Sequence, residues 1–357
     1  MPLVSPFRTS FGTQTSKDAL LLRAVTSAAE GWGECVAAQY PLYASEYVDA
    51  AMTTLRDFLV PALADLAVVD VNLVGPVLER YRGHRMSKAA LEMALWDAEL
   101  RAAGTPMSRA LGAVATAVPA GVSVGIMDTL DELVATVGGY LEEGYRRIKL
   151  KIEPGWDVAA VKVIRDEFGD VPLQVDANTA YTLADVDQLR KLDDFDLLLI
   201  EQPMAEENVL GHAELARHLR TPICLDESIT SARAAADAIR AGACRVVNIK
   251  AGRVGGYLEA RRVHDVCRAH DVPVWCGGML ETGLGRAANA ALAALPGMLL
   301  PGDVSASSRF YQRDITEPLV LQDGFMAVPT GPGLGVTPIA EVLEAVTVHR
   351  EWLPVAS

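Results

Sequence analysis

The middle of the chain repeats one format about every 25 residues: a short apolar run, a polar residue near its end, and a stretch of helical composition. The separations between equivalent positions are 27, 25, 25, 24 and 25 residues for Lys149, Asp176, Glu201, Asp226, Lys250 and Trp275. The apolar runs lie at residues 118–125, 147–152, 173–178, 197–203, 222–228, 246–252, 273–278 and 299–306. Strand-like runs that alternate with helices are typical of a parallel sheet covered by helices.

Two architectures fit eight such units: an open doubly wound sheet and a closed barrel of alternating strands and helices. Eight units between residues 118 and 306 favour the barrel, whose typical length is about 250 residues. A doubly wound fold for dinucleotides would be expected to carry G-x-G-x-x-G after its first strand, and GVSVGIMD at 121–128 does not match. The sequence therefore predicts an α/β fold with a TIM-like barrel.

The two ends of the chain lie outside this repeat. Residues 1–110 contain a strand-like run at 19–26 and a long helical stretch at 87–104. We interpret them as an N-terminal capping domain of α+β type, followed by the barrel at 111–315. The tail, 316–357, has turns and short strands, and we expect it to pack with the capping domain.

Composition and charge limit the partners of the protein. Half of the residues are hydrophobic and 22% are charged, which is typical of a globular protein. The net charge of −14 argues against nucleic acid and anionic membrane surfaces as partners. The N-terminal residues do not resemble a secretory signal, and no run approaches the roughly 18 apolar residues of a membrane helix. The five cysteines form no C-x-x-C pair, and we expect a reduced, cytoplasmic protein.

Charged residues interrupt the predicted strands at their carboxyl ends, where barrel enzymes build their active sites. Three consecutive strands deliver Asp176, Glu201 and Asp226 at the same register. A single carboxylate there is as well explained by a structural ion pair, but three that converge repel one another unless a cation holds them. Ligation by oxygen alone points to a hard divalent ion such as Mg²⁺ or Mn²⁺. No histidine falls in this set, which argues against zinc.

Lysines occupy two other strand ends. Lys149 and Lys151 lie on the second strand and Lys250 on the sixth, four positions apart, so we expect them on opposite walls of the barrel mouth. A substrate carboxylate bound to the metal would present one face of its α-carbon to each wall, and the metal would stabilise the enediolate formed when the α-proton leaves. A lysine acts as the base only if its pKa is lowered, and we expect Lys149 to help lower that of Lys151.

Other interpretations explain less of the pattern. A Schiff-base enzyme would use one lysine but not three carboxylates. A metal-binding protein without catalysis would use the carboxylates but not the opposed lysines.

The motifs IKLKIEPGWD, QVDANTAYT, LIEQPM, CLDESI, VNIKAGRVGG and CGGMLETGLGRAANAALA resemble those of the enolase superfamily. Within it, the chain resembles the o-succinylbenzoate synthase / N-succinylamino acid racemase family over nearly its whole length. The resemblance implies a (β/α)7β barrel with an α+β capping domain. It also implies dehydration of 2-succinyl-6-hydroxy-2,4-cyclohexadiene-1-carboxylate in menaquinone biosynthesis, racemisation of N-succinyl amino acids, or both.

The resemblance assigns a role to each residue that matches the family's motifs. It implies a divalent metal, Mg²⁺ first and Mn²⁺ or Co²⁺ as alternatives, held by Asp176, Glu201 and Asp226. Lys151 and Lys250 become the acid/base pair, and Lys149 tunes Lys151. Asn178 and Glu227 take supporting roles. In the elimination one lysine is base and then acid while Lys250 acts electrostatically, and in racemisation each lysine serves one face.

The substrate is expected to be a small-molecule carboxylate, and the protein a homo-oligomer. The expected substrate contacts are Ser123, Gly278, Met279, Leu280, Arg253, Phe310 and Phe7. The alternative for the two phenylalanines is ordinary interdomain packing, and for Arg253 an ion pair or a helix cap. Dipeptide epimerisation is the rival activity. It calls for an acidic pair at the eighth strand, where GDVSAS offers only Asp303.

Two departures from the family pattern stand out. The chain begins at MPLVSPF, where we expect relatives to carry roughly ten further residues that open the cap, so we predict a misassigned or truncated start that intact-mass measurement would test. Ala251 stands where relatives more often have proline. Because proline fixes φ, we expect Ala251 to loosen the turn after Lys250.

Overall fold

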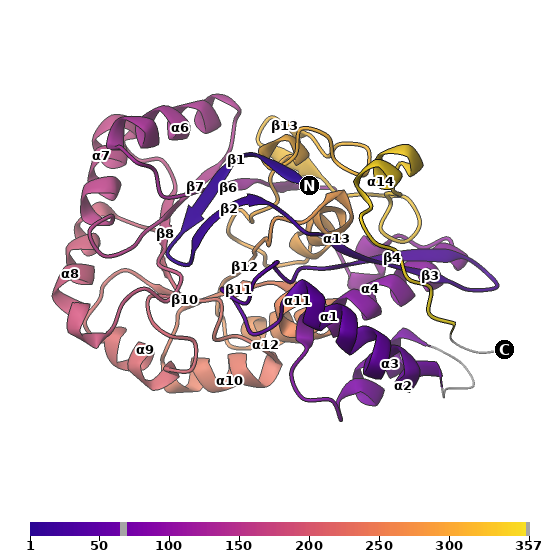
Figure 1. Cartoon of the computed structure of the whole chain (residues 1–357). Helices are drawn as coiled ribbons and strands as arrows, with labels where there is room; N and C mark the ends of the chain where they lie inside the picture. The colour runs from indigo at the N-terminus through magenta and orange to yellow at the C-terminus, as the bar shows by residue number, and fades with distance from the viewer. Residues whose placement is uncertain (65–69, 355–357) are drawn as a thin grey trace.

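A seven-stranded parallel sheet forms the centre of the molecule, where the repeat predicted a parallel sheet of eight strands. The computed structural model describes residues 1–64 and 70–354 (Figure 1). Neighbouring strands follow in chain order, and each adjacent pair is parallel. The strands are β6 Gly121–Val124, β7 Arg147–Lys151, β8 Leu173–Asp176, β9 Ile200–Glu201, β10 Ile223–Leu225, β11 Val246–Ile249 and β12 Val274–Cys276.

The prediction of an eighth strand at residues 299–306 is wrong, because this segment forms no regular strand. Pro301 within it has no N–H to donate to a ladder. The segment still joins the edges of the sheet, since Met298 bridges Val274 and Gly302 bridges Ala120. A Cβ on Gly302 would lie 2.7 Å from the carbonyl oxygen of Cys276, so glycine permits this approach. These bridges close the barrel.

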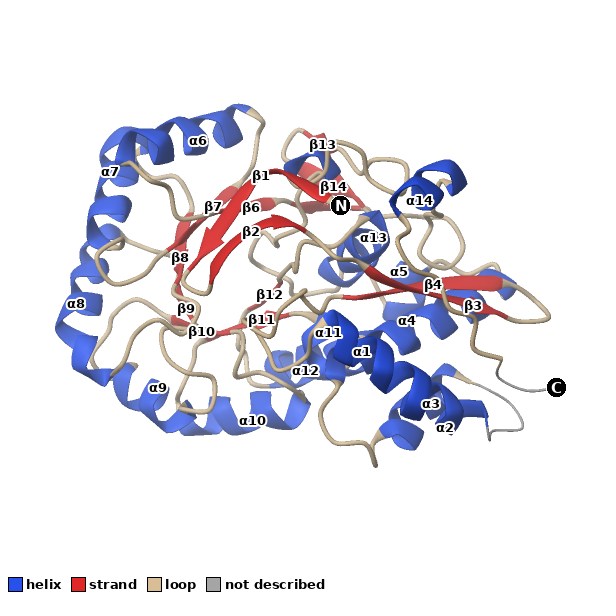
Figure 2. Ribbon diagram, in the orientation of Figure 1, coloured by secondary structure: helices blue, strands red, loops and turns tan. Residues whose placement is uncertain are grey.

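Helices cover the outside of the sheet, and α6 to α10 form an arc around the strands (Figure 2). A typical one, α10, begins where the Ser231 side chain accepts a hydrogen bond from Ala234 N and ends at Gly242, whose φ is +71°. The helices are α6 Leu130–Glu142, α7 Val158–Phe168, α8 Val186–Arg190, α9 Val209–Leu215, α10 Ala232–Ala241, α11 Ala251–Val254, α12 Tyr257–Ala269 and α13 Gly283–Ala293, with 3₁₀ turns at Leu183–Asp185, Lys191–Phe195 and Ser307–Arg309.

Strand β7 shows how the alternation of the sequence divides between core and site. Ile148, Leu150 and Ile152 belong to the main hydrophobic core. Lys149 and Lys151 contact carboxylates of other strands instead, and both are buried. The lysine face of this strand therefore does not meet bulk water.

The N-terminal region combines strands and helices beside the barrel. Its hairpin of β3 and β4 packs on α4, the helix predicted at 87–104. A Cβ on Gly31 or Gly33 would lie 2.1–2.2 Å from backbone oxygens of α4, so this packing requires glycine at both positions. The elements are β1 Pro2–Thr9, β2 Gly12–Ser16, β3 Leu20–Val25, β4 Glu30–Cys35, α1 Val48–Thr54, a π-helical turn Leu55–Leu59, α2 Val60–Ala64, α3 Val71–Leu78, α4 Arg85–Ala102 and α5 Met107–Leu111.

The C-terminal tail contacts both parts. Its strands β13 Leu321–Gln322 and β14 Phe325–Ala327 form an antiparallel sheet with β5 Ala117–Pro119. Residues 118–125, predicted as one strand, are therefore divided between β5 and β6, with Ala120 between them. Leu334 N donates to Asp97 of α4 at 2.7 Å, which ties the tail to the N-terminal region before α14 Ala340–Val346.

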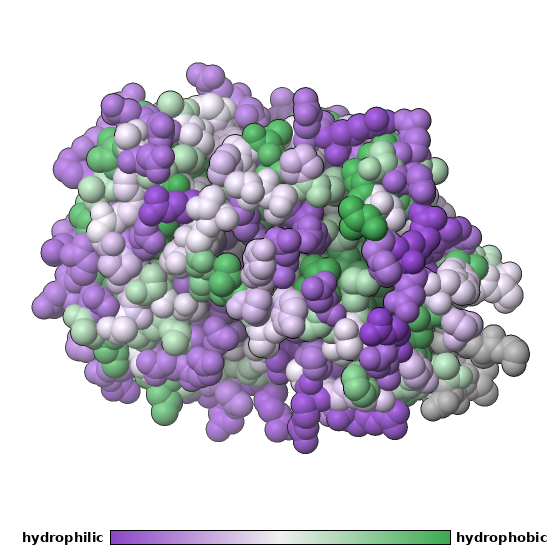
Figure 3. Space-filling model, in the orientation of Figure 1, coloured by the Kyte–Doolittle hydropathy of each residue, from purple (hydrophilic) through white to green (hydrophobic). Residues whose placement is uncertain are grey.

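The hairpin of β1 and β2 crosses in front of β6, β7 and β8 (Figure 1). Ile126 N donates to Arg8 O at 2.9 Å, and Ser10 Oγ donates to Asn178 O at 3.0 Å. Hydrophilic residues occupy much of the periphery of the molecule in this view (Figure 3). Among the described residues, no helix combines the length and the apolar character needed to cross a membrane.

Candidate active site

The carboxyl ends of the strands gather the predicted lysines and carboxylates in one place. Asp176 ends β8, Glu201 ends β9 and Asp226 follows β10, and all three are fully buried. Three strands separate β7, which carries Lys151, from β11, after which Lys250 lies. The prediction that the lysines occupy opposite walls is therefore confirmed.

Lys151 is held by residues of the barrel. Its Nζ donates to Asp176 Oδ2 at 2.6 Å and to Asn178 Oδ1 at 2.7 Å. Asn178 has a φ of +41°, a region that asparagine tolerates better than most residues. Its Nδ2 donates to Glu227 Oε1 at 2.9 Å. Asn178 and Glu227 thus form the chain of contacts that orients the Lys151 ammonium.

Lys149 lies deeper in the barrel and is surrounded by carboxylates. Its Nζ lies 2.7 Å from Asp303 Oδ2, 3.1 Å from Glu201 Oε2 and 3.4 Å from Asp176 Oδ2. Burial lowers the pKa of Lys149, but Asp303, Glu201 and Asp176 together raise it well above its ordinary value. Lys149 therefore stays protonated, and it lies beside Lys151 because the Nζ atoms of both lysines contact Asp176 Oδ2.

Lys250 combines a barrel contact with a contact to the N-terminal region. Its Nζ donates to Asp226 Oδ2 at 2.6 Å and to Tyr43 Oη at 3.2 Å. Burial lowers the pKa of Lys250, but Asp226 and the other acidic groups raise it well above the ordinary value. The sequence predicted a lowered pKa for a lysine that acts as a base. The pKa of Lys250 is raised instead, because the carboxylates outweigh burial.

The lysines do not neutralise the three carboxylates equally. Burial and then Asp176 raise the pKa of Glu201 to about 8. Burial also acts on Asp176, but Lys151 and Lys149 lower its pKa below the ordinary range. Glu227 has its pKa raised by burial and by Asp226, and its Oε2 has no hydrogen-bond partner among the described residues. Glu201 is thus the least compensated of the three predicted ligands.

The residues present fit a hard divalent cation. Within residues 1–64 and 70–354, no three His, Cys, Asp or Glu side chains stand in an arrangement that would hold a metal as they are. The contacts explain this, since Lys151 and Lys250 lie against oxygens of Asp176 and Asp226. The donor set itself, three buried carboxylates on adjacent strands with an uncompensated Glu201 among them, is the chemistry that Mg²⁺ or Mn²⁺ prefers.

Two of the predicted substrate contacts, Phe7 and Phe310, meet at the β1–β2 hairpin, because Phe7 is on β1. The rings of Phe7 and Phe310 meet edge to face with centroids 6.1 Å apart, and the Nζ of Lys151 lies 6.0 Å from the Phe7 ring centroid. The Phe7 side chain therefore lies near Lys151 and also packs against Phe310. Ser123 is on β6, and its buried Oγ has no hydrogen-bond partner in the described part of the chain.

The loop after β12 brings the predicted residues Gly278, Met279 and Leu280 together. Met279 packs against an apolar cluster of the N-terminal region that also contacts Tyr43. Leu280 has a φ of +57°, and its carbonyl oxygen accepts a hydrogen bond from Tyr311 Oη at 2.6 Å.

Arg253 is directed toward Asp226 rather than away from it. Its Nη2 lies 2.9 Å from Asp226 Oδ1 and donates to Asn248 O at 3.0 Å. The guanidinium also donates to Ile229 O. This is the ion-pair arrangement that the sequence left as an alternative, and its contacts are with a predicted metal ligand.

Sequence reasoning missed Tyr43 and the role of Asp303. Tyr43 lies in a loop of the N-terminal region that no periodicity or motif marks. Asp303 Oδ1 accepts from Arg147 at 2.8 Å while Oδ2 accepts from Lys149 at 2.7 Å. The available signal was that Arg147 and Lys149 both point inward and require a counter-ion. Asp303 is the acid on the segment that completes the barrel.

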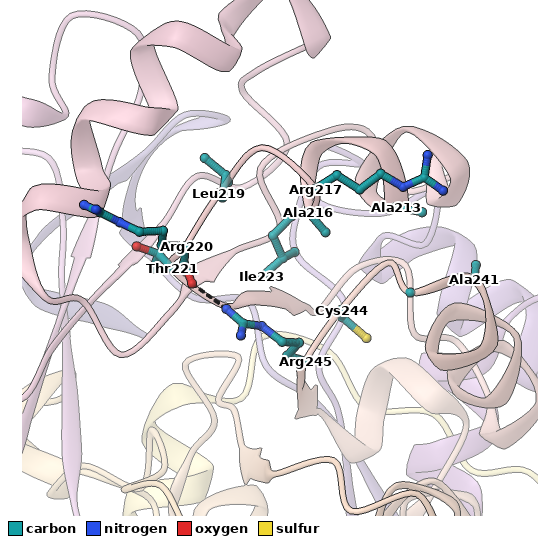
Figure 4. A pocket seen from close by; sticks show the side chains of 11 residues that line it. Ala213, Ala216, Arg217, Leu219, Arg220, Thr221, Ile223, Ala241, Cys244 and Arg245 are labelled. Carbon is teal, nitrogen blue, oxygen red and sulfur yellow. Dashed lines mark hydrogen bonds between the residues drawn. The ribbon is translucent and has the colours of Figure 1, made fainter.

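A separate cavity of about 640 Å³ opens at the opposite end of β10 and β11 (Figure 4). Ile223, Cys244 and Arg245 line it, together with Arg220 and Leu219. These residues precede or begin their strands, whereas Asp226 and Lys250 follow them. The cavity therefore lies away from the lysines and carboxylates.

Comparisons with known proteins agree with this fold. The chain matches the family model of the mandelate racemase / muconate lactonizing enzyme N-terminal domain over residues 1–112. It matches the enolase C-terminal domain-like model over residues 132–342. A solved enolase-superfamily structure from Listeria innocua Clip11262 aligns with a TM-score of 0.93 at 38% identity, covering 97% of this chain and 94% of that one.

Among curated proteins, an N-succinylamino acid racemase from an Amycolatopsis species is 66% identical over 354 residues, covering 99% of this chain and 96% of that protein. An o-succinylbenzoate synthase from Geobacillus kaustophilus is 47% identical over 337 residues, covering 94% and 90%. The L-Ala-D/L-Glu epimerase of Bacillus subtilis is 27% identical over 345 residues, covering 94% and 93%. Enolase-superfamily enzymes use a divalent metal. The chain belongs to the o-succinylbenzoate synthase / N-succinylamino acid racemase family of the enolase superfamily.

Proposed function

We propose that this protein abstracts the α-proton of carboxylate substrates, acting as an o-succinylbenzoate synthase and as an N-succinylamino acid racemase. The observation that carries the proposal is the placement of Lys151 and Lys250 on opposite walls, with three buried carboxylates on the strands between them. Each lysine can then reach one face of a substrate α-carbon held in the mouth. In the cell, we propose that the enzyme acts in the cytoplasm as a homo-oligomer.

The three carboxylates Asp176, Glu201 and Asp226 would hold the divalent cation, for which we propose Mg²⁺. When bound, this cation would supply a Lewis acid for the substrate carboxylate and would take up part of the carboxylate charge that the lysines now contact. Asn178 fixes the direction of the Lys151 Nζ through its 2.7 Å contact. Lys149, kept cationic by Asp303, favours the neutral form of Lys151.

Proton movements differ between the two reactions. In the synthase reaction Lys151 takes the α-proton and returns it to the departing hydroxyl group, which leaves as water. Lys250 stays protonated and stabilises negative charge, a role that suits a lysine whose pKa is raised by Asp226. In racemisation one lysine takes the proton from its face and the other delivers a proton to the opposite face.

The substrate body is proposed to contact Ser123, Gly278, Met279 and Leu280. Phe7 covers it from the β1–β2 hairpin and Phe310 lies beside Phe7. Arg253 would act through Asp226, which it contacts at 2.9 Å.

Dipeptide epimerisation is less well supported by the site. Recognition of a substrate ammonium needs free carboxylates at the end of the eighth barrel segment. Asp303 is the acid there, and its two oxygens are taken by Arg147 and Lys149.

The test is an isotope experiment with two substrates. The enzyme with Mg²⁺ is incubated in D₂O with an N-succinyl amino acid, and turnover of the cyclohexadiene substrate is followed in parallel. We expect deuterium at the α-carbon, dehydration of the second substrate, and loss of both on chelation with recovery when Mg²⁺ is restored. Deuterium exchange without dehydration would exclude the synthase activity, and dehydration without deuterium exchange would exclude the racemase activity.

A further inference from the structure

A carboxylate of the N-terminal region is buried at the start of a barrel helix. Glu34, on β4, is 3% exposed. One of its oxygens accepts from Thr282 N at 2.9 Å, and the other accepts from Thr282 Oγ1 at 2.7 Å and from Gly285 N at 3.0 Å. Thr282 and Gly285 belong to the first turn of α13, so Glu34 satisfies the free N–H groups of a helix in another part of the fold.

Glycine at position 285 makes room for this carboxylate. A Cβ there would lie 3.0 Å from a carboxylate oxygen of Glu34 and 2.7 Å from Cγ of Glu281. The Lys17 ammonium, itself buried, donates to the carbonyl oxygens of Val36 and Ala37, just after β4. The arrangement thus joins buried charged groups of the N-terminal region to the start of α13.

The loop immediately before α13 is the one predicted to contact the substrate. Glu281 Oε2 accepts from Met279 N at 2.8 Å, and Glu281 Oε1 accepts from Asn289 Nδ2 at 2.9 Å. Tyr311 donates to the carbonyl of Leu280, which has positive φ. Glu281, Tyr311 and Arg286 hold this strained loop from within the barrel, and Glu34 holds its end from the N-terminal region.

We propose that Glu34 is a positioning residue for the substrate loop formed by residues 278–282. By holding the start of α13, it transmits the position of β4 to Met279 and Leu280, and so sets the fit of the substrate side chain. The apolar contact of Met279 with the cluster of Cys35, Val36 and Ala37 runs parallel to this link. The inference rests on the proposed function for its consequence on substrate binding, but not for the order of the loop.

The chain offers a matched control. Glu92 of α4 is also buried, and its Oε1 accepts from Leu258 N at 3.1 Å in the first turn of α12. A Cβ on Gly256 would lie 2.2 Å from that oxygen, so this contact also needs glycine. Glu92 therefore joins the N-terminal region to a barrel helix in the same way, but the helix does not follow the substrate loop.

The experiment compares Glu34→Gln with Glu92→Gln in the full-length enzyme. Glutamine keeps one acceptor oxygen but turns an amide N–H toward a backbone donor, so both variants should lose thermal stability. For Glu34→Gln we expect KM for N-succinyl amino acids to rise about tenfold, a change of about 1.4 kcal/mol in binding, with kcat within about threefold. Hydrogen exchange should accelerate in residues 278–285. Glu92→Gln should leave KM within about twofold and accelerate exchange near residue 257 instead.

Either an unchanged KM in Glu34→Gln or an equal rise in Glu92→Gln would overturn the inference. If Glu34→Gln does not fold, Thr282→Val removes the 2.7 Å hydrogen bond from the Thr282 side. This variant should also raise KM with little change in kcat, but by a smaller factor than Glu34→Gln. If the wild type showed neither α-proton exchange nor dehydration, the proposed function alone would be overturned. The comparison of backbone amide exchange between variants would still stand, because it uses no substrate. Unaltered exchange in residues 278–285 of Glu34→Gln would overturn the positioning role even if both activities are found.

Discussion

The two walls of the barrel mouth are built differently. The Lys151 ammonium donates hydrogen bonds to Asp176 and Asn178 of the barrel. The β1–β2 hairpin above it contacts the barrel through Ser10 Oγ and Arg8 O, and its Phe7 ring lies 6.0 Å from the Lys151 Nζ. Lys250 is held by Asp226 and by Tyr43 of the N-terminal region. On that side the region is further anchored by buried carboxylates at the starts of α12 and α13. We infer that barrel residues set the position of the Lys151 ammonium, whereas the position of the Lys250 ammonium also depends on how the N-terminal region packs on the barrel.

Removing Lys151 should have the largest effect, because no neighbouring lysine can take its place while Lys149 is kept protonated by three carboxylates. We expect Lys151→Ala to lower kcat of the synthase reaction by about 10²–10⁴-fold and to abolish racemisation. Steady-state assays on both substrates measure this. Lys162→Ala serves as the control, because its side chain is 60% exposed and pairs with Asp166. Full activity in Lys151→Ala would show that the mechanism is wrong.

Removing Lys250 should separate the two reactions. We expect Lys250→Ala to abolish racemisation but to retain α-proton exchange for the enantiomer whose proton faces Lys151. The synthase reaction should fall by about 10²-fold but still turn over, since Lys250 contributes charge rather than proton transfer there. NMR of each enantiomer in D₂O gives the exchange rates. Equal loss of exchange for both enantiomers would contradict the assignment of one lysine to each face.

The link between Tyr43 and Lys250 should have a smaller effect. Tyr43→Phe removes the hydrogen bond that Lys250 donates at 3.2 Å and the longer one, 3.4 Å, that Tyr43 Oη donates to Asp226 Oδ2. The shorter of these bonds contributes about 0.5–1.5 kcal/mol. We therefore expect a roughly two- to tenfold loss in the half-reaction that uses Lys250, with little change in exchange by Lys151. Tyr40→Phe is the matched control, because Tyr40 is in the same loop and 62% exposed. Equal losses in both half-reactions would mean that Tyr43 does not distinguish the walls.

The sequence predicted the Lys151 wall better than the Lys250 wall for a physical reason. Lys149, Lys151 and Asp176 stand at strand positions, where period-two alternation and parallel register fix the direction of each side chain. Tyr43 and Glu34 reach the barrel from segments far away in the chain, and no local pattern encodes that docking. The irregular segment around Pro301 was predicted as a strand because its composition is apolar, although its one proline and its glycine prevent a ladder.

The anchored side also predicts a pH dependence of stability. Burial raises the pKa of Glu92 from 4.5 to about 7, against the hydrogen bonds from Leu258 and Tyr257 and the charge of Arg262, while Glu259 adds to the rise. The folded state therefore holds the proton more tightly than the unfolded state. The stability gained is fully present below pH 4.5 and is lost as the pH rises through about 7.

A shift of this size corresponds to about 3 kcal/mol. We therefore expect the urea midpoint of the wild type to fall, relative to that of Glu92→Gln, between pH 4.5 and pH 7.5, because glutamine carries no charge to bury. Unfolding followed by tryptophan fluorescence at several pH values measures the difference. Parallel pH profiles for the two proteins would show that the Glu92 carboxylate is ionised without cost in the folded state. The N-terminal region would then be anchored on the Lys250 side by hydrogen bonding alone, with no penalty from buried charge.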